Sequence, residues 1–237
     1  MSLYVYAITA ASHPLHLDEL KGVGDPPTDL RAICGDSVCA VVSETPDDLK
    51  VKRRDMNAHH EVQARLFEEG TTLPLHFGLL AEDEDAVRAV LAEGEQVFSQ
   101  RIEELTDRVE FNVKAAWDED AALRDILDQS EELRKLNEAT RNDDATYEQR
   151  LALGETLSQE VQRRQETLAA EIVEELRPLV QAERVAPPSD QYAVNASFLI
   201  DRERADAFGE AAGRLSERLG EQAGIRVLGP LPPYSFA

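Results

Sequence analysis

The stretch VEFNVKAAW, residues 109–117, decides how the chain divides. Its side chains alternate in type, with Val109, Phe111, Val113, Ala115 and Trp117 on one face and Glu110, Asn112 and Lys114 on the other. Such alternation is typical of a β-strand with one face in water. Short strand and helix patterns precede this stretch, and long acidic helical patterns follow it. We therefore expect a domain boundary near residue 117.

Working back toward the start of the chain, the patterns predict three more strands and two helices. The strands are LYVYAI at 3–8, SVCAVVSE at 37–44 and TTLPLHFGLL at 71–80, and the helices cover 55–69 and 84–105. Pro74 should force an edge or a bulge in the third strand, because proline cannot donate to a sheet. The order β-β-α-β-α-β predicts a compact N-terminal α+β domain over residues 1–117.

Working forward, residues 118–237 predict a second α+β domain with a long helical hairpin. Apolar residues at helical spacing run from Ala122 to Leu136, and again from Tyr147 to Leu176, so that the second helix has about 30 residues. A strand at 191–200, a helix at 203–220 and a strand at 225–228 follow. The fold class expected is thus α+β with two domains.

Composition excludes several classes of partner. The 237 residues include 47 acidic and 25 basic side chains, a formal net charge of −22. Nucleic acids and anionic membrane surfaces both attract clustered lysine and arginine, so neither is expected as a partner. No secretory signal and no apolar run of membrane-spanning length is present, and we expect a cytoplasmic protein.

No residue pattern indicates catalysis, a metal or a cofactor. Adjacent histidines on a helix point about 100° apart and cannot chelate one ion from that helix, and the other histidines lack a third ligand at useful spacing. Two cysteines are too few for a four-ligand zinc site, and we expect them to be buried free thiols. The histidines considered are His13, His16, His59, His60 and His76, and the cysteines are Cys34 and Cys39. We expect no enzyme.

The last nine residues, GPLPPYSFA, contain three prolines and two aromatic residues but no charged side chain. Proline stiffens this tail, which lowers the entropy lost when it docks. An exposed segment of this apolarity would also promote aggregation. We therefore expect the tail to dock on its own chain, and contact with a partner is the alternative.

Two motifs resemble those of a known family. LPLHFG at 73–78 resembles a Leu-Pro-x-Arg-Phe-Gly segment, and GPLPPYSF at 229–236 resembles a terminal Gly-Pro-Trp-Pro-Pro-Tyr-x-Phe segment. With LYVYAI and VEFNVKAAW in matching order, the chain resembles the gas vesicle protein F/L family over nearly its whole length. It departs from the pattern at His76, where arginine is usual, and at Leu231, where tryptophan is usual.

The resemblance implies a two-domain protein whose C-terminal part is a modified ferredoxin-like arrangement with long helices. It also implies a non-enzymatic accessory or minor structural protein of gas vesicle assembly, located at the gas vesicle. Its expected partners are the small hydrophobic shell protein, which it would help to nucleate or keep from aggregating, and other accessory proteins. The motif residues implied as a structural or partner site are Leu73, Pro74, His76, Phe77, Gly78, Gly229, Pro230, Pro232, Pro233, Tyr234 and Phe236.

Two other interpretations stay open at the level of sequence. One is a ferredoxin-like protein that binds a small ligand or has a regulatory role, which requires a deep pocket with convergent polar groups. The other is a helical adaptor that uses residues 145–177 as its partner surface.

Overall fold

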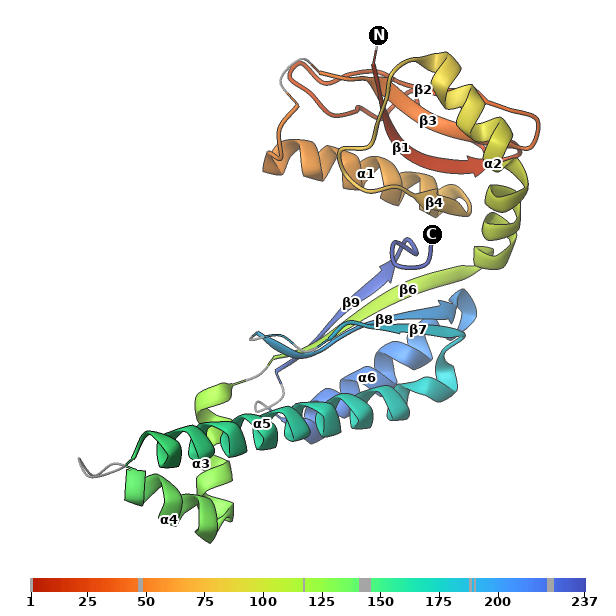
Figure 1. Ribbon diagram of the computed structural model, residues 1–237. Coiled ribbons are helices and arrows are strands. Elements are labelled where there is room, and N and C mark those ends of the chain that lie inside the picture. Colours follow the sequence, from red (N-terminus) through yellow and green to blue (C-terminus); the bar gives the residue numbers. More distant parts are fainter. Residues whose placement is uncertain are drawn as a thin grey trace. The chain divides into compact units, whose positions relative to one another are not determined.

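The chain forms two compact units in the computed structural model, which describes residues 2–46, 49–116, 118–140, 146–187, 189, 191–220 and 224–237 (Figure 1). The first unit comprises Met1–Glu110 and Gly229–Ala237, and the second comprises Phe111–Leu228. The C-terminal tail therefore returns to the unit that contains the N-terminus.

The first unit is an antiparallel sheet with two helices. The sheet order is β2-β3-β1-β4, with β5 also pairing with β1. The elements are β1 (Leu3–Ala10), β2 (Leu30–Cys34), β3 (Val38–Glu44), α1 (Arg53–Glu69), β4 (Thr72–Pro74), β5 (Leu80–Ala81) and α2 (Glu84–Leu105).

A bulge in β1 determines which of its side chains face each helix. The register with β3 shifts between Val5 and Ala7, so the alternation of faces changes phase there. Tyr4, Tyr6 and Ala7 pack in one apolar cluster with α1, where Leu66 is buried. Residues on the other face of the sheet contact α2. Every residue of β1 except Ala10 is therefore buried, as expected for a strand covered on both faces.

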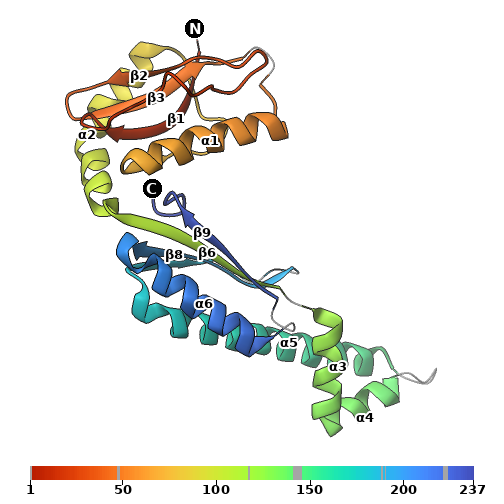
Figure 2. The same cartoon turned by 180° about the vertical axis from the view of Figure 1, so that it is seen from behind.

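The described part of the second unit contains the other sheet, of order β7-β8-β6-β9, and the helices α3 to α6 (Figure 2). Its elements are β6 (Arg108–Ala116), α3 (Glu119–Gln129), α4 (Glu131–Thr140), α5 (Tyr147–Leu176), β7 (Ala182–Val185), β8 (Tyr192–Asp201), α6 (Ala205–Leu219) and β9 (Ile225–Leu231), with single 3₁₀ turns at Arg177–Leu179 and Arg202–Arg204.

Aromatic packing holds α6 against this sheet. The ring centroid of Phe208 lies 4.9 Å from that of Phe111 and 5.6 Å from that of Phe198, and both Phe198 and Phe208 are fully buried. On α6, Arg218 forms ion pairs with Glu171 and Glu175 of α5, which runs beside it. The helices α3 and α4 pack on the other part of α5 through a small apolar cluster of Ile126, Leu133 and Leu153.

The structure differs from the sequence expectation in where the units divide. The strand expected to close the first domain at residue 117 pairs with β8 and β9 in the second sheet, and the compact units divide between Glu110 and Phe111. The helix expected over residues 122–136 is broken at Ser130, whose backbone is extended and whose side chain accepts from Leu133 N. Trp117 and residues 141–145 lie outside the described residues.

The expectation of free thiols is wrong. Cys34 and Cys39 face each other as register partners across the β2–β3 hairpin, with their Cα atoms 4.0 Å apart, and they form a disulfide. Cys34 is exposed and Cys39 is buried. Two cysteines close in sequence carry little signal by themselves, because only the hairpin register brings them opposite each other.

Within the described ranges, no helix has both the length and the apolar character needed to cross a membrane.

Candidate interaction site

The 73–78 motif forms an edge of the first sheet and a turn beyond it. Leu73 and Pro74 are buried in β4, and Phe77 is half-buried. His76 and Gly78 are exposed. Gly78 has φ of +90°, a conformation that glycine adopts at little cost and other residues rarely adopt. The final glycine of the motif is therefore explained by backbone geometry.

The helix α1 holds this turn through its buried polar side chains. The carbonyl oxygen of Leu75 accepts hydrogen bonds from His59 Nε2 at 3.0 Å and from Gln63 Nε2 at 2.7 Å. Because Nε2 of His59 donates, Nδ1 is the acceptor, and the Tyr4 hydroxyl donates to it at 2.9 Å. The same hydroxyl accepts from Gly78 N at 3.0 Å. These bonds connect β1, α1 and the motif.

Burial keeps this network uncharged near neutral pH. Desolvation lowers the pKa of His59 to about 4, and the hydrogen bond to Leu75 opposes this only in part. Desolvation also raises the pKa of Tyr4 to about 12. The neutral imidazole of His59 is hydrogen-bonded through both nitrogens, and the phenol of Tyr4 both donates and accepts a hydrogen bond. Their polar atoms are therefore engaged within the protein. The arrangement therefore positions the turn.

The C-terminal motif is anchored on the first unit. Pro232, Pro233 and Phe236 are buried, whereas Gly229 and Pro230 are exposed in β9. The carboxylate of Glu110, 3% exposed, accepts from Ser235 N and from Ser235 Oγ, each at 2.7 Å. Hydrogen bonds to an ionised carboxylate are stronger than bonds between neutral groups. The tail is docked on its own chain in this structure.

The same helix contacts both motifs. The ring of His59 lies edge-on to Phe77 at 5.6 Å between centroids, and the ring of the next residue, His60, lies edge-on to Tyr234 at 5.9 Å. His60 Nδ1 is 3.4 Å from the Tyr234 hydroxyl. Burial, with a smaller contribution from the Glu110 charge, raises the pKa of Tyr234 to about 12. Two neighbouring histidines thus connect α1 to the two halves of the candidate site.

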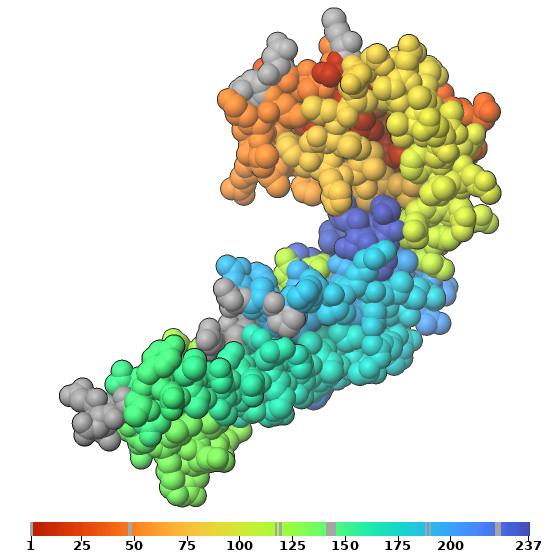
Figure 3. All heavy atoms as spheres, viewed as in Figure 1, coloured from red at the N-terminus to blue at the C-terminus, as the bar shows by residue number. Residues whose placement is uncertain are grey.

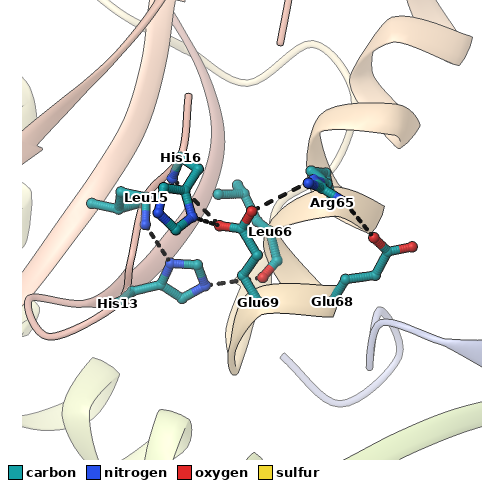
Figure 4. Close-up of polar contacts among 7 residues, drawn as sticks. All are labelled: His13, Leu15, His16, Arg65, Leu66, Glu68 and Glu69. Carbon is teal, nitrogen blue, oxygen red and sulfur yellow. Dashed lines mark hydrogen bonds and ion pairs between the residues drawn. The ribbon is translucent and has the colours of Figure 1, made fainter. Parts of the chain in front are cut away.

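The C-terminal end of α1 is fixed by the loop that follows β1 (Figure 4). His13 Nδ1 accepts from Leu15 N at 3.2 Å, so Nε2 carries the proton and donates to the Leu66 carbonyl at 2.9 Å. His16 and Arg65 both pair with Glu69. A Cβ added to Gly70 would lie 2.8 Å from His13 Cδ2, so glycine is needed there for close approach.

Among the residues that the structure describes, no group of three potential His, Cys, Asp or Glu metal ligands occurs. Sequence reasoning found the two motifs but missed the side chains that hold them, which are Tyr4, Gln63, Glu110 and Ser235. Glu110 was expected on the wet face of its strand. A buried glutamate there has no sequence signal, because its partner is more than a hundred residues away.

Comparison with known proteins places the chain in a family. The model for gas vesicle synthesis protein GvpL/GvpF matches residues 2–237. The chain is 44% identical to gas vesicle protein F of Streptomyces sp. (strain CB03234) over 100% of this chain and 99% of that protein. It is 30% identical to gas vesicle protein L of the same organism, over 99% and 92%.

The fold has solved counterparts. The crystal structure of the gas vesicle protein GvpF from Anabaena sp. PCC7120 superimposes with a TM-score of 0.84 at 24% identity, covering 100% of this chain and 98% of that one. That of gas vesicle protein GvpF from Microcystis aeruginosa gives a TM-score of 0.85 at 22% identity, covering 99% and 98%. The chain belongs to the GvpL/GvpF family of gas vesicle synthesis proteins.

Proposed function

We propose that this protein is a non-enzymatic accessory or minor structural component of gas vesicles that binds the small hydrophobic shell protein, keeps it from aggregating and helps its nucleation. The observation that carries the proposal is the family match over residues 2–237. The net charge of −22 makes the role physically reasonable, because an acidic escort adds charge repulsion and solubility to an apolar client. We place the protein in the cytoplasm and at the gas vesicle, where it would also meet other accessory proteins.

We further propose that the two compact units act as two domains, the second being a modified ferredoxin-like arrangement with long helices. The four-stranded sheet of β6, β7, β8 and β9, packed with α5 and α6, supports this proposal.

Co-expression with the shell protein tests the function. We expect the tagged chain to retain freshly made shell protein in a pull-down and to raise the soluble fraction of shell protein relative to an unrelated acidic protein of similar size. Binding at both low and moderate salt is expected, because apolar contacts should dominate. If the chain retains no shell protein under either condition, the proposed function is wrong.

A further inference from the structure

An apolar groove lies between α2 and the segment that follows the 73–78 motif. Its volume is about 420 Å³. Val5, Ile8 and Ala40 of the sheet form its floor, and its walls include Leu80 from β5 and Val90 from α2. Pockets that bind small molecules have volumes of about 300–1,000 Å³ and mostly apolar linings, and this groove falls in the same range. The groove has the size and lining of a site that accepts a few apolar side chains.

Several apolar side chains of the groove wall are exposed, and one exposed valine, Val97, lies on α2 beyond the lining. Leu80 is 49% exposed and Val90 is 55% exposed, and the neighbouring Leu79 and Val97 are 46% and 68% exposed. The atoms of α2, yellow to yellow-green, form an open surface of the first unit (Figure 3). Glycine at position 94 has a local role here, since a Cβ would collide with the Phe98 ring that lines the groove. Contiguous exposed apolar surface of this kind marks interaction sites.

One acidic side chain, that of Glu82, lines the groove. Four acidic residues in a row, residues 82–85, stand where the chain enters α2. Two of them are engaged locally: Asp83 accepts from Ala86 N at 2.8 Å, and Glu84 pairs with Arg31 and Arg88. A carboxylate beside an apolar lining favours a partner with a basic residue next to its apolar side chains.

We propose that this groove binds an apolar segment of a client protein that carries basic residues beside its apolar side chains. Exposed apolar side chains at Leu79, Leu80 and Val90 and, two turns further along α2, at Val97 favour a peptide over a compact small molecule, because a peptide can cover all four. The identification of the client as the shell protein rests on the proposed function. The proposal that the groove binds an apolar, basic segment is independent of that function.

A designed peptide tests the groove independently of the client. The probe is a fluorescent peptide of alternating leucine and serine with two lysines at each end, titrated into the full chain. We expect Val90→Asn to weaken binding about tenfold, and Val51→Asn, at a valine that is 78% exposed outside the groove, to leave it unchanged. Glu82→Gln should weaken binding about two- to fivefold at low salt, and Glu19→Gln, its exposed control, should not.

Three results would overturn the proposal. One is equal binding by Val90→Asn and the wild type. Another is equal affinity for a peptide with glutamates in place of the lysines. The third is binding of a small apolar dye with no binding of the peptide, which would make the groove a small-molecule site.

Retention of shell protein separates this inference from the proposed function. If the wild type retains it and Val90→Asn does not, both are supported. If the peptide binds but shell protein is not retained, the proposed function fails and the groove stands. If Val90→Asn retains as much shell protein as the wild type, the shell protein does not bind through the groove, and weaker binding of the peptide by Val90→Asn would still support the groove as a site for another client.

Discussion

At the scale of single residues, the neighbours His59 and His60 have different environments. His59 is 2% exposed and bonded through both ring nitrogens, whereas His60 is exposed and meets the tail. Successive residues of a helix point about 100° apart, which is why adjacent side chains reach different surfaces. The lowered pKa of buried His59 couples its titration to stability.

The first prediction concerns pH. The pKa of His59 is lowered from 6.5 to about 4 in the folded state, so the unfolded chain binds the proton first as pH falls. The free energy of unfolding should therefore decrease between about pH 6.5 and pH 4, by up to about 3 kcal/mol, and the contribution should be constant outside that window. Urea unfolding at a series of pH values measures it.

Two variants separate His59 from the other titrating groups. His59→Gln should remove the pH slope in that window, whereas His76→Gln should preserve most of it, because the charge of His76 is the smallest of the named causes of the His59 pKa shift. An unchanged slope in His59→Gln would show that His59 is not the group responsible.

The second prediction concerns Glu110, the buried anchor of the tail. Glu110→Gln keeps the shape but replaces an ionised acceptor, so we expect a loss of about 1–3 kcal/mol in the free energy of unfolding. Ser235→Ala removes the hydroxyl donor to the same carboxylate. A double-mutant cycle should then give a coupling energy, and strictly additive effects would contradict the assigned contact.

At the scale of elements, the sequence predicted the helices and strands whose hydrophobic periodicity is strong. It missed elements that are defined by pairing with another part of the chain. The helix expected at 84–105 is α2 to the residue, and the expected helix of about 30 residues is α5, Tyr147–Leu176. The strand β2 was not expected, because only Ile33 of its five residues is fully buried and its identity as a strand comes from pairing with β3. The break between α3 and α4 had one signal, a serine suited to an N-cap at position 130.

The same distinction applies to the residues of the candidate site. The motif residues were found from the sequence, and Gly78 has the backbone conformation that glycine favours. The polar side chains that fix the motifs were not found. Their partners come from distant elements, as with Gln63 and Leu75 or Ser235 and Glu110.

The third prediction concerns the tail as an element. Deleting residues 232–237 removes buried Phe236, two buried prolines and the contacts of Ser235, so we expect a loss of about 3–5 kcal/mol in stability. Removing only Ala237, which is exposed, is the matched control. Melting of the isolated chain measures both. If the long deletion melts like the control yet no longer supports vesicle formation, the tail acts on a partner instead.

At the scale of the whole molecule, added salt has two opposing effects on stability, because the protein has both exposed ion pairs and a large net charge. Many ion pairs are exposed, such as Lys21 with Asp29 and Lys135 with Glu131, and screening weakens pairs of this kind. The same screening weakens repulsion among the 22 excess negative charges. Exposed pairs contribute little to stability, because water already screens them and their side chains lose entropy on pairing. Repulsion should therefore dominate.

The last prediction follows from that balance. Raising the ionic strength from about 0.01 M to about 0.15 M shortens the screening length from about 30 Å to about 8 Å, which removes most long-range repulsion while short contacts persist. The melting temperature should rise, by about 2–4 °C for each kcal/mol of repulsion removed. Sodium and potassium chloride at equal ionic strength should act alike if screening is the cause. A melting temperature that falls with added salt would show that the ion pairs outweigh the repulsion, and the acidic surface would then be stabilised by its own pairing.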